Sequence, residues 1–270
     1  MKNLLRTDLA PIGDAAWRLL RETARTSLVG QLSSRRFVDV EGPHGWEFAA
    51  VNLGRLRLAE AKPVEHVRWG IREVQPLVEF RTEFALDLWE LDNVERGALN
   101  PDLKALLEAT HRAALFEEHA VYHGLKDAGI IGILGATVHP PLTCKGDPAS
   151  LAETLEHAIV VIENCGIGGP FGLVVEAPVY ERLMIGAVEG YPIRKRVEPL
   201  FAAGIRWSPA VQGAVVLSAR GGDYVLSIGQ DHAIGYQAHD AHTVTLYLTA
   251  SFTFQVREPA AAVAIRIPSA

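Results

Sequence analysis

Residues 80–97 read FRTEFALDLWELDNVERG, and this stretch is the point from which the fold can be worked out. Phe80, Phe84 and Leu86 alternate with the charged Arg81 and Glu83. A period of two is typical of a β-strand with one buried face. The pattern predicts a strand over residues 80–89, with a long hairpin before it and a long helix after it.

The region before this strand, residues 46–77, has the pattern strand, charged tip, strand. Its two arms are EFAAVNLGRLRL (47–58) and VRWGIREVQPLV (67–78), and the charged residues and Pro63 gather between them. An isolated two-stranded ribbon is marginally stable in water. We therefore expect the hairpin to pair with the body of the chain or with another subunit.

The region after the strand predicts the longest helix of the chain. Asn100 can cap this helix, Pro101 suits its first turn, and Gly129 stands where a C-terminal cap belongs. Apolar residues recur between them at helical spacing, so the pattern predicts a helix over residues 101–128. The same spacing predicts an N-terminal helix over residues 11–29.

The remaining sequence alternates helices and strands and then becomes rich in strands. Residues 140–220 predict an α/β unit with helices at 148–164, 178–185 and 193–203 and strands at 171–177 and 213–220. Residues 223–228 are expected to return through Gly221-Gly222 as the hairpin partner of the last of these. Two strands follow, TVTLYLTASFTFQV (243–256) and AVAIRI (262–267).

Composition excludes several classes of function. The 270 residues include 26 Lys and Arg against 32 Asp and Glu, a net charge of −6, which argues against a nucleic-acid partner. No apolar run is long enough to span a membrane, and Arg6 and Asp8 interrupt any signal peptide. The two cysteines, Cys144 and Cys165, predict no disulfide framework. We expect a soluble cytoplasmic protein.

Motifs for chemistry are weak. Glu108 and His111 have the Glu-x-x-His spacing of di-iron helices, but no second motif of this kind accompanies them. GIGGPFG (166–172) fails the dinucleotide fingerprint and predicts a helix-to-strand turn. Three histidines and an aspartate could in principle bind a divalent ion, although a polar loop is the simpler interpretation: His232, His239, Asp240 and His242.

Several longer stretches resemble one known family. They are LAPIGDAAW (9–17), RRFVDVEGPHGWE (35–47), GRLRL (54–58), FALDLWELDNVERG (84–97), RKRVEPL (194–200), RGGDYVLSIGQDHAIGY (220–236) and LYLTASFTFQV (246–256). In this order they resemble the encapsulin shell proteins of family 1, the linocin or bacteriocin-like family. The resemblance implies an α+β fold of the Hong Kong 97 phage-capsid type. It assigns residues 1–45, 78–139 and 221–270 to a P-domain, 46–77 to an E-loop and 140–220 to an A-domain.

The resemblance implies a structural role and not an enzymatic one. Such chains self-assemble into a closed icosahedral nanocompartment of 60 subunits or a multiple of 60. The shell encloses a cargo enzyme, a ferritin-like iron-storage protein or a dye-decolourising peroxidase linked to oxidative stress. Two alternatives remain open, a flavin- or metal-dependent enzyme working as a small oligomer and a prophage capsid protein.

The resemblance also implies three sets of site residues. The cargo's C-terminal targeting peptide would bind at Leu28, Leu32, Arg35, Val38, Asp39, Ile234 and Tyr236. A five-fold pore that passes small ions and substrates would be lined by Met184, Ile185, Gly186, Ala187, Val188, Glu189, Gly190 and Tyr191. No cofactor is required and no metal site is expected, but an FMN-like flavin could stack on Trp89 with Arg81 on the same strand face.

Overall fold

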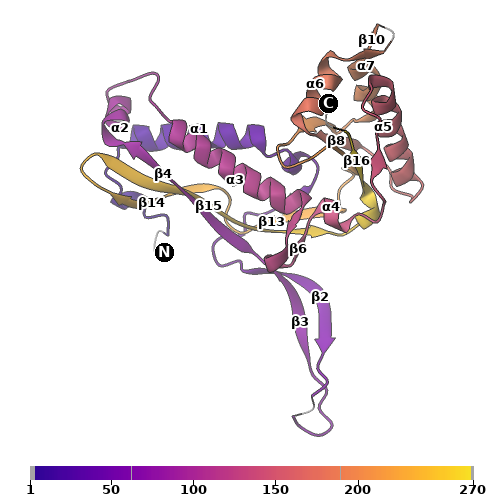
Figure 1. Ribbon diagram of the computed structural model, residues 1–270. Helices are drawn as coiled ribbons and strands as arrows, with labels where there is room; N and C mark the ends of the chain where they lie inside the picture. Colours follow the sequence, from indigo (N-terminus) through magenta and orange to yellow (C-terminus); the bar gives the residue numbers. More distant parts are fainter. Residues whose placement is uncertain (1–3, 62, 189, 269–270) are drawn as a thin grey trace.

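The computed structural model describes residues 4–61, 63–188 and 190–268. Figure 1 shows three parts: a body of long helices lying on a twisted sheet, a second α/β unit beside it, and a narrow arm that projects from the body. Within the described residues, no helix combines the length and the apolarity that crossing a membrane requires.

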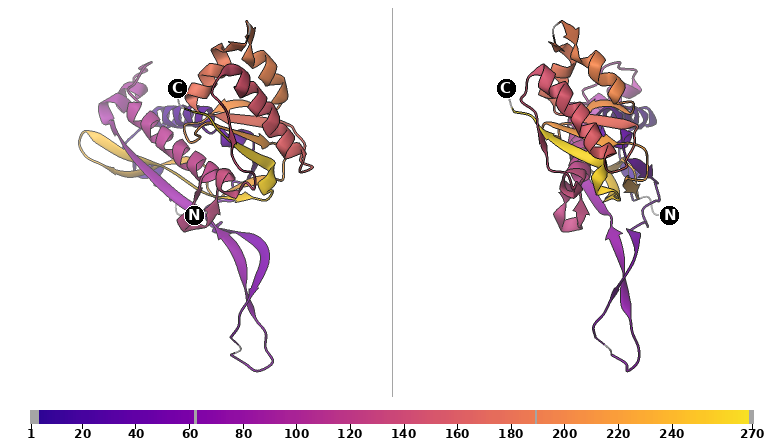
Figure 2. Two further views of the ribbon diagram at one scale, coloured as in Figure 1. Left: turned by 45° about the vertical axis from the view of Figure 1, so that its right-hand side comes forward. Right: turned by 90° about the vertical axis from the view of Figure 1, so that its right-hand side faces the viewer.

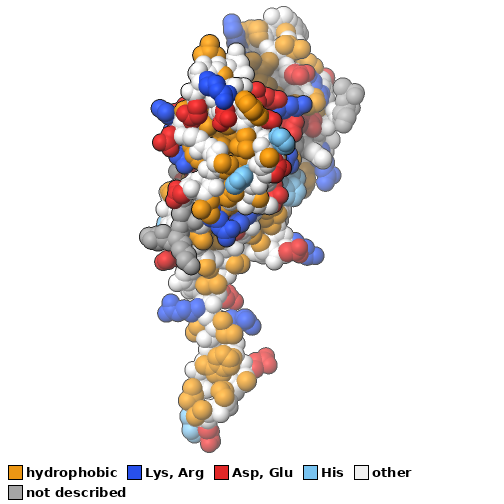
Figure 3. Space-filling view, turned by 90° about the vertical axis from the view of Figure 1, so that its left-hand side faces the viewer, with side chains coloured by type: hydrophobic (Ala, Val, Ile, Leu, Met, Phe, Trp, Pro, Cys, Tyr) orange, Lys and Arg blue, Asp and Glu red, His pale blue; other side chains and the backbone are white. Residues whose placement is uncertain are grey.

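The arm is the predicted hairpin, formed by β2 (Ala50–Leu58) and β3 (Gly70–Pro76). The two strands pair antiparallel, with a register shift between Asn52 and Leu56 where Gly54 has a φ of +69°. Figures 1 and 2 show that the arm stands away from the body along most of its length. Apolar side chains cover it in Figure 3, and those exposed are Leu53, Leu56, Leu58, Val64, Val67, Trp69, Ile71 and Val74.

The body sheet is organised around β15 (Thr243–Val256), a strand of 14 residues. Its residues 243–252 pair with β4 (Val78–Asp87), while residues 244–249 also pair with β14 (Ala233–His239). β4 and β14 therefore lie on opposite edges of β15. Beyond β14, residues 252–256 pair with β13 (Tyr224–Ile228), which pairs in parallel with β1 (Asp39–Glu41).

Two long helices pack together on this sheet, α1 (Asp14–Gln31) and α3 (Lys104–Tyr122). The apolar stripe of α1, which includes Trp17, Leu20 and Leu28, is buried against α3 and the sheet. Shorter elements complete the body: η1 (Thr7–Leu9), η2 (Ser34–Arg36), α2 (Leu88–Glu95), β5 (Gly124–Leu125), η3 (Lys126–Ala128), β6 (Ile130–Ile131), α4 (Ile133–Ala136) and η5 (Pro259–Ala261).

The second unit contains a sheet in the order β11 (Gly204–Trp207), β8 (Phe171–Val175), β12 (Ala214–Ser218), β16 (Ala262–Arg266), β7 (Leu142–Thr143). Around it lie α5 (Pro148–Glu163), α6 (Ala177–Ile185), β9 (Ala187–Val188), β10 (Tyr191–Pro192), α7 (Ile193–Val197) and η4 (Glu198–Leu200). β16 departs from the division expected from the sequence, since it follows the body strands in the chain yet pairs inside this sheet. The GIGGPFG segment leads from α5 into β8, as predicted.

The predicted helix over residues 101–128 is shorter than expected. α3 ends at Tyr122 because Gly124 adopts a φ of +88°, and a Cβ there would collide with the carbonyl oxygen of Ile130. Gly129 has the predicted left-handed conformation, with a φ of +67°, but it closes η3. At the other end the side chain of Asp102, not that of Asn100, accepts from the N–H of Lys104.

Two further expectations were wrong. The strand does not continue to residue 89, because the Asp87 carboxylate accepts from the N–H groups of Trp89 and Glu90 and caps α2. Residues 223–228 are not the hairpin partner of residues 213–220. Gly222 has a φ of +84° and donates its N–H to Asp39 on β1, which leads the chain into the body sheet.

Candidate functional site

A groove of about 670 Å³ lies between the C-terminal half of α1 and the start of β14. Its floor is apolar because the helical spacing of Ala24, Leu28 and Leu32 points these side chains toward the sheet. Ile234 and Leu248 complete the floor from the strands, and both are buried. The remaining lining residues are Leu5, Arg21, Arg25, Val29, Arg35, Arg36, Asp231, His232 and Ala233. A concave apolar site with a few polar groups suits a small ligand or a short peptide.

The groove brings together four of the seven residues that the sequence assigned to cargo docking: Leu28, Leu32, Arg35 and Ile234. Tyr236 packs against the hydrophobic core between α1, α3 and the body sheet, to which Leu28, Leu32 and Ile234 also belong. Val38 lies in a second hydrophobic core, which includes the strands β8, β12 and β16 of the second unit. Asp39 accepts a hydrogen bond from the Gly222 N–H. Neither residue belongs to the lining of the groove. The docking role of all seven residues stays a prediction.

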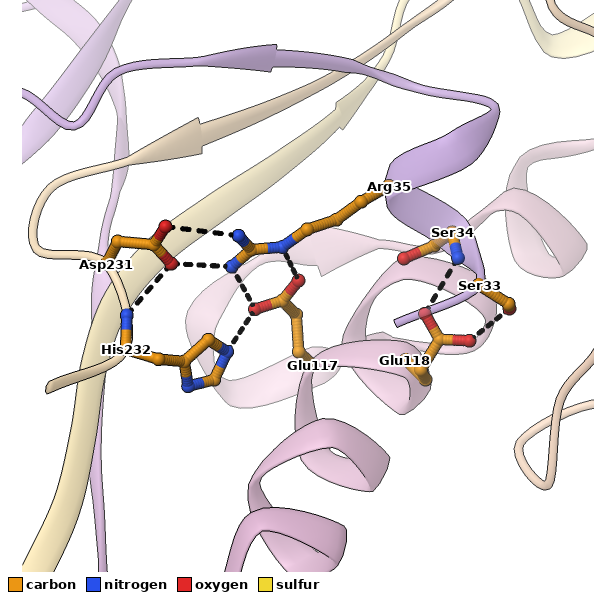
Figure 4. Close-up of polar contacts among 7 residues, drawn as sticks. All are labelled: Ser33, Ser34, Arg35, Glu117, Glu118, Asp231 and His232. Atoms are coloured by element: carbon orange, nitrogen blue, oxygen red, sulfur yellow. Dashed lines mark hydrogen bonds and ion pairs between the residues drawn. The ribbon is translucent and has the colours of Figure 1, made fainter. Parts of the chain in front are cut away.

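One wall of the groove is fixed by a partly buried ionic cluster, shown in Figure 4. The Arg35 guanidinium donates to Glu117 through Nε at 2.6 Å and through Nη2 at 2.8 Å, and it also pairs with Asp231 at 2.9 Å. His232 Nε2 lies 3.0 Å from the second oxygen of Glu117. Glu117 is fully buried, and among the described residues Arg35 is the cation that compensates its charge, while His232 adds a hydrogen bond. The cluster therefore joins η2, α3 and the loop before β14.

The cluster holds Glu117 ionised. Burial by itself would raise its pKa, but the hydrogen bonds from Arg35 and His232 outweigh this and lower the pKa to about 2. The pKa of Asp231 is lowered as well, against burial, by its hydrogen bond with Arg35. Both carboxylates thus stay charged at neutral pH.

The adjacent Glu118 behaves in the opposite way. It is buried on another face of α3, where it accepts from Ser33 Oγ, from the Ser34 N–H at 2.8 Å and from Ser208 Oγ at 2.8 Å. None of these donors carries a charge, so burial dominates and raises the pKa of Glu118. Two neighbouring glutamates therefore anchor the segment after α1, and their pKa values are shifted in opposite directions.

Several groove residues escaped the sequence prediction: Leu5, Arg21, Arg25, Val29, Arg36, Asp231 and His232. A signal was present for the helical ones, because Arg21, Arg25 and Val29 recur at i, i+4 spacing in the row next to that of Ala24, Leu28 and Leu32. No local pattern marks Leu5 or Asp231, because they reach the groove through tertiary contacts.

The groups considered for metal binding are not brought together. His232 contacts Glu117, while His239 Nδ1 lies 2.6 Å from the Tyr236 hydroxyl. Asp240 accepts the N–H groups of His242 and Thr243 and shapes the turn before β15. Across residues 4–61, 63–188 and 190–268, no group of three or more His, Cys, Asp or Glu residues could hold a metal ion.

Glu108 and His111 take separate partners. The Glu108 carboxylate lies 4.0 Å from the ammonium group of Lys104, one helical turn away. His111 Nδ1 lies 2.7 Å from Gln31 Oε1 on α1. Both contacts are surface pairings between helical positions.

The flavin prediction assumed that Trp89 and Arg81 lie on the same face of one strand, but the structure places them on different elements. Trp89 lies on α2, is 65% exposed and has the Arg96 guanidinium 5.7 Å from its ring centroid. Arg81 on β4 stacks over Tyr247 at 4.7 Å and pairs with Glu79. Flavin binding by Trp89 stays a prediction, without Arg81 placed beside it.

Within the segment predicted to line a pore, β9 and β10 pair antiparallel at the tip of the second unit (Figure 1). Met184 and Ile185 end α6, and Gly190 turns the chain between β9 and β10 with a φ of +82°. Ile185 is 85% exposed and Tyr191 is exposed too. Glu189 lies outside the described residues, and the lining of a pore by residues 184–191 stays a prediction.

Comparisons with known proteins agree on the fold and the family. The family described as "Encapsulating protein for peroxidase" matches residues 1–253. Type 1 encapsulin shell proteins of Rhodospirillum rubrum and Mycobacterium tuberculosis are 40% and 38% identical, covering 98% of this chain in both cases and 97% and 99% of the relatives.

Two solved structures support the same fold at low identity. A virus-like particle from Pyrococcus furiosus has a TM-score of 0.64 at 16% identity, covering 92% of this chain and 98% of that one. A Mycobacterium phage Bobi chain has a TM-score of 0.56 at 15% identity, covering 89% and 91%. They confirm the predicted α+β capsid fold of the Hong Kong 97 type. The chain belongs to the type 1 encapsulin shell proteins, a family with a structural and not a catalytic role.

Proposed function

We propose that this chain assembles in the cytoplasm into a closed icosahedral compartment of 60 subunits, or a multiple of 60, around a cargo enzyme. The observation that carries the assembly proposal is the arm. Its two strands leave apolar side chains such as Leu56 and Ile71 exposed, and such a surface is expected to be covered in a stable particle. A second copy of the chain would supply that cover and add strand partners to the open edges.

Size-exclusion chromatography with light scattering, followed by negative-stain imaging, tests the assembly. We expect closed particles in the megadalton range. A stable monomer or dimer at micromolar concentration would contradict the proposal and would favour the alternative of a small oligomeric enzyme. Nucleic acid inside purified particles would instead favour the prophage capsid alternative.

The groove between α1 and β14 is proposed to bind the cargo's C-terminal targeting peptide. A peptide fits because β14 is an edge strand of the body sheet, and the Tyr236 N–H donates to the Leu5 carbonyl oxygen at 2.8 Å, so an extended segment can pair along this edge. Ile234, two residues earlier on the same edge, lines the groove. An extended tail could therefore gain main-chain hydrogen bonds there and bury small aliphatic side chains on the floor.

The description of the matched family favours a peroxidase as the cargo. A ferritin-like iron-storage protein remains the second possibility, and both chemistries are linked to oxidative stress. Small ions and substrates would reach either enzyme through pores, of which the loop at residues 184–191 is the candidate lining. Mass spectrometry of native particles identifies the cargo directly.

Val29→Asp tests the docking site without disturbing the core. Val29 lines the groove but is 57% exposed, so the substitution leaves the buried stripe of α1 intact. A carboxylate at this position would lie against the apolar docking surface, and we expect cargo loading to fall about tenfold. The measurement is the amount of cargo per purified shell.

Val160→Asp is the matched control, because Val160 is an exposed helical valine (47%) on α5, away from the groove. It should load cargo like the unmodified chain. Equal loading by both variants would show that the peptide binds elsewhere.

A further inference from the structure

The rim of the groove carries a charge opposite to that of the whole chain. Four arginines line it, namely Arg21, Arg25, Arg35 and Arg36, against a single carboxylate, Asp231. The chain as a whole has a net charge of −6. The basic rim is therefore a local feature, set directly beside the apolar floor.

The four arginines are not equivalent. Arg35 is committed to Glu117 and Asp231 in the partly buried cluster. The Arg21 guanidinium lies 5.3 Å from the centroid of the Trp17 ring, over which it stacks. Arg25 and Arg36 are exposed and form no ion pair within the described part of the chain. These two cations are available to a ligand.

We propose that the occupant of the groove is an aliphatic segment that carries carboxylate side chains, and that Arg25 and Arg36 bind those carboxylates. This inference rests on the proposed docking of a cargo peptide and names the chemistry that the peptide must have. The floor accepts the aliphatic side chains of the segment. The two rim arginines select its charge and fix its register along the groove.

The position of the two arginines explains why they would discriminate between acidic and basic segments. An exposed ion pair in water is weak and screened by salt. Beside an apolar segment that excludes water from one side, the same pair is less screened. A basic residue at the same place on the ligand would be repelled by both arginines, which gives selectivity by rejection as well as by attraction.

A competition between two cargo tails tests the inference. Two fluorescent proteins of different colour are co-expressed with the full chain. Both carry a short C-terminal tail of leucine, isoleucine, glycine and serine, one with added aspartates and the other with asparagines at the same places. The ratio of the two colours in purified shells is the selectivity. We expect about a fivefold preference for the acidic tail, the size of one or two exposed ion pairs.

Arg25→Glu and Arg36→Glu should each abolish this preference, and the double variant should reverse it. Arg18→Glu is the matched control: Arg18 is an exposed arginine on the same helix, outside the groove lining, without an ion pair in the described residues. It alters the charge of the chain by the same amount as each single variant and should keep the preference.

The outcomes separate the two proposals. Equal loading of both tails, unaffected by Arg25→Glu and Arg36→Glu, overturns the charge inference and leaves peptide docking intact. Loading of neither tail contradicts docking itself, and the inference falls with it. If shells fail to assemble with Arg25→Glu and Arg36→Glu but assemble with Arg18→Glu, the rim contacts a second copy of the chain and the inference is wrong.

Discussion

Glu117→Gln is expected to destabilise the chain by about 3 kcal/mol, because it leaves Arg35 without its buried ionic partner. Glu118→Gln should cost about 1 kcal/mol or less. Glu118 has only uncharged donors around it and a raised pKa, so a neutral amide resembles the form that burial already favours. The two variants replace a carboxyl group by an amide at adjacent positions of one helix, and each serves as the control for the other.

Thermal unfolding measured by differential scanning fluorimetry distinguishes the two variants. In a chain of this size 1 kcal/mol corresponds to roughly 2–4 °C, so Glu117→Gln should lower the midpoint by about 6–12 °C. Equal shifts for the two variants would contradict the opposite pKa shifts assigned to Glu117 and Glu118.

The pH dependence of stability carries the same signature. The pKa of Glu117 falls from 4.5 to about 2 on folding, so its contribution is present above pH 4.5 and is lost as the pH falls toward 2. The raised pKa of Glu118 has the opposite sign, since stability is lost as the pH rises above 4.5. Glu117→Gln should therefore flatten the acid limb of the stability profile, and Glu118→Gln should flatten the limb above pH 4.5.

Removing the arm is expected to abolish closed particles while leaving the subunit folded. Asn52 and Val74 are cross-strand partners, so an Asn-Gly turn can join them directly in place of residues 53–73. Of these, the described residues 53–61 and 63–73 contribute no side chain to the hydrophobic core of the body or of the second unit, which is why the subunit should keep its fold. What is lost is an apolar surface on which each side chain covered by a second copy contributes roughly 1.5–3 kcal/mol.

Light scattering of the shortened chain should give a small species, with circular dichroism close to that of the full chain. Two double variants of the full-length arm test whether assembly needs its apolar side chains or only its length. Leu56→Ser with Ile71→Ser should prevent closure, whereas Arg57→Ser with Arg72→Ser, their cross-strand partners, should still give particles. Megadalton particles of the shortened chain would show that contacts elsewhere suffice for assembly.

Elements with one clear periodicity were predicted well from the sequence. The alternation over residues 243–256 gave β15 with its observed ends, and the hairpin at residues 46–77 was confirmed as β2 and β3. Where two local signals competed, prediction failed. Leu88 and Trp89 continue an alternating pattern, but the carboxylate of Asp87 caps a helix at the same place and prevails.

The part of the groove that α1 forms could be predicted, because α1 has one clear periodicity. Leu28 and Leu32 follow from helical spacing, whereas Asp231 and Leu5 reach the site only because β14 pairs with β15 and with the N-terminal segment. The pairing of Glu117 with Arg35 joins residues 82 positions apart, and neither position carries a local signal of it. The resemblance to a family led to the prediction of the docking residues, whereas the ion pairs beside them became visible only in the folded structure.

The placement of β16 has a consequence for synthesis of the chain. β16 is an interior strand of the second sheet, between β12 and β7, yet its residues leave the ribosome last among the strands described. Until these residues have emerged, β12 lacks this neighbour and the second sheet is incomplete. The order of strands thus delays completion of the second sheet until residue 266 has emerged.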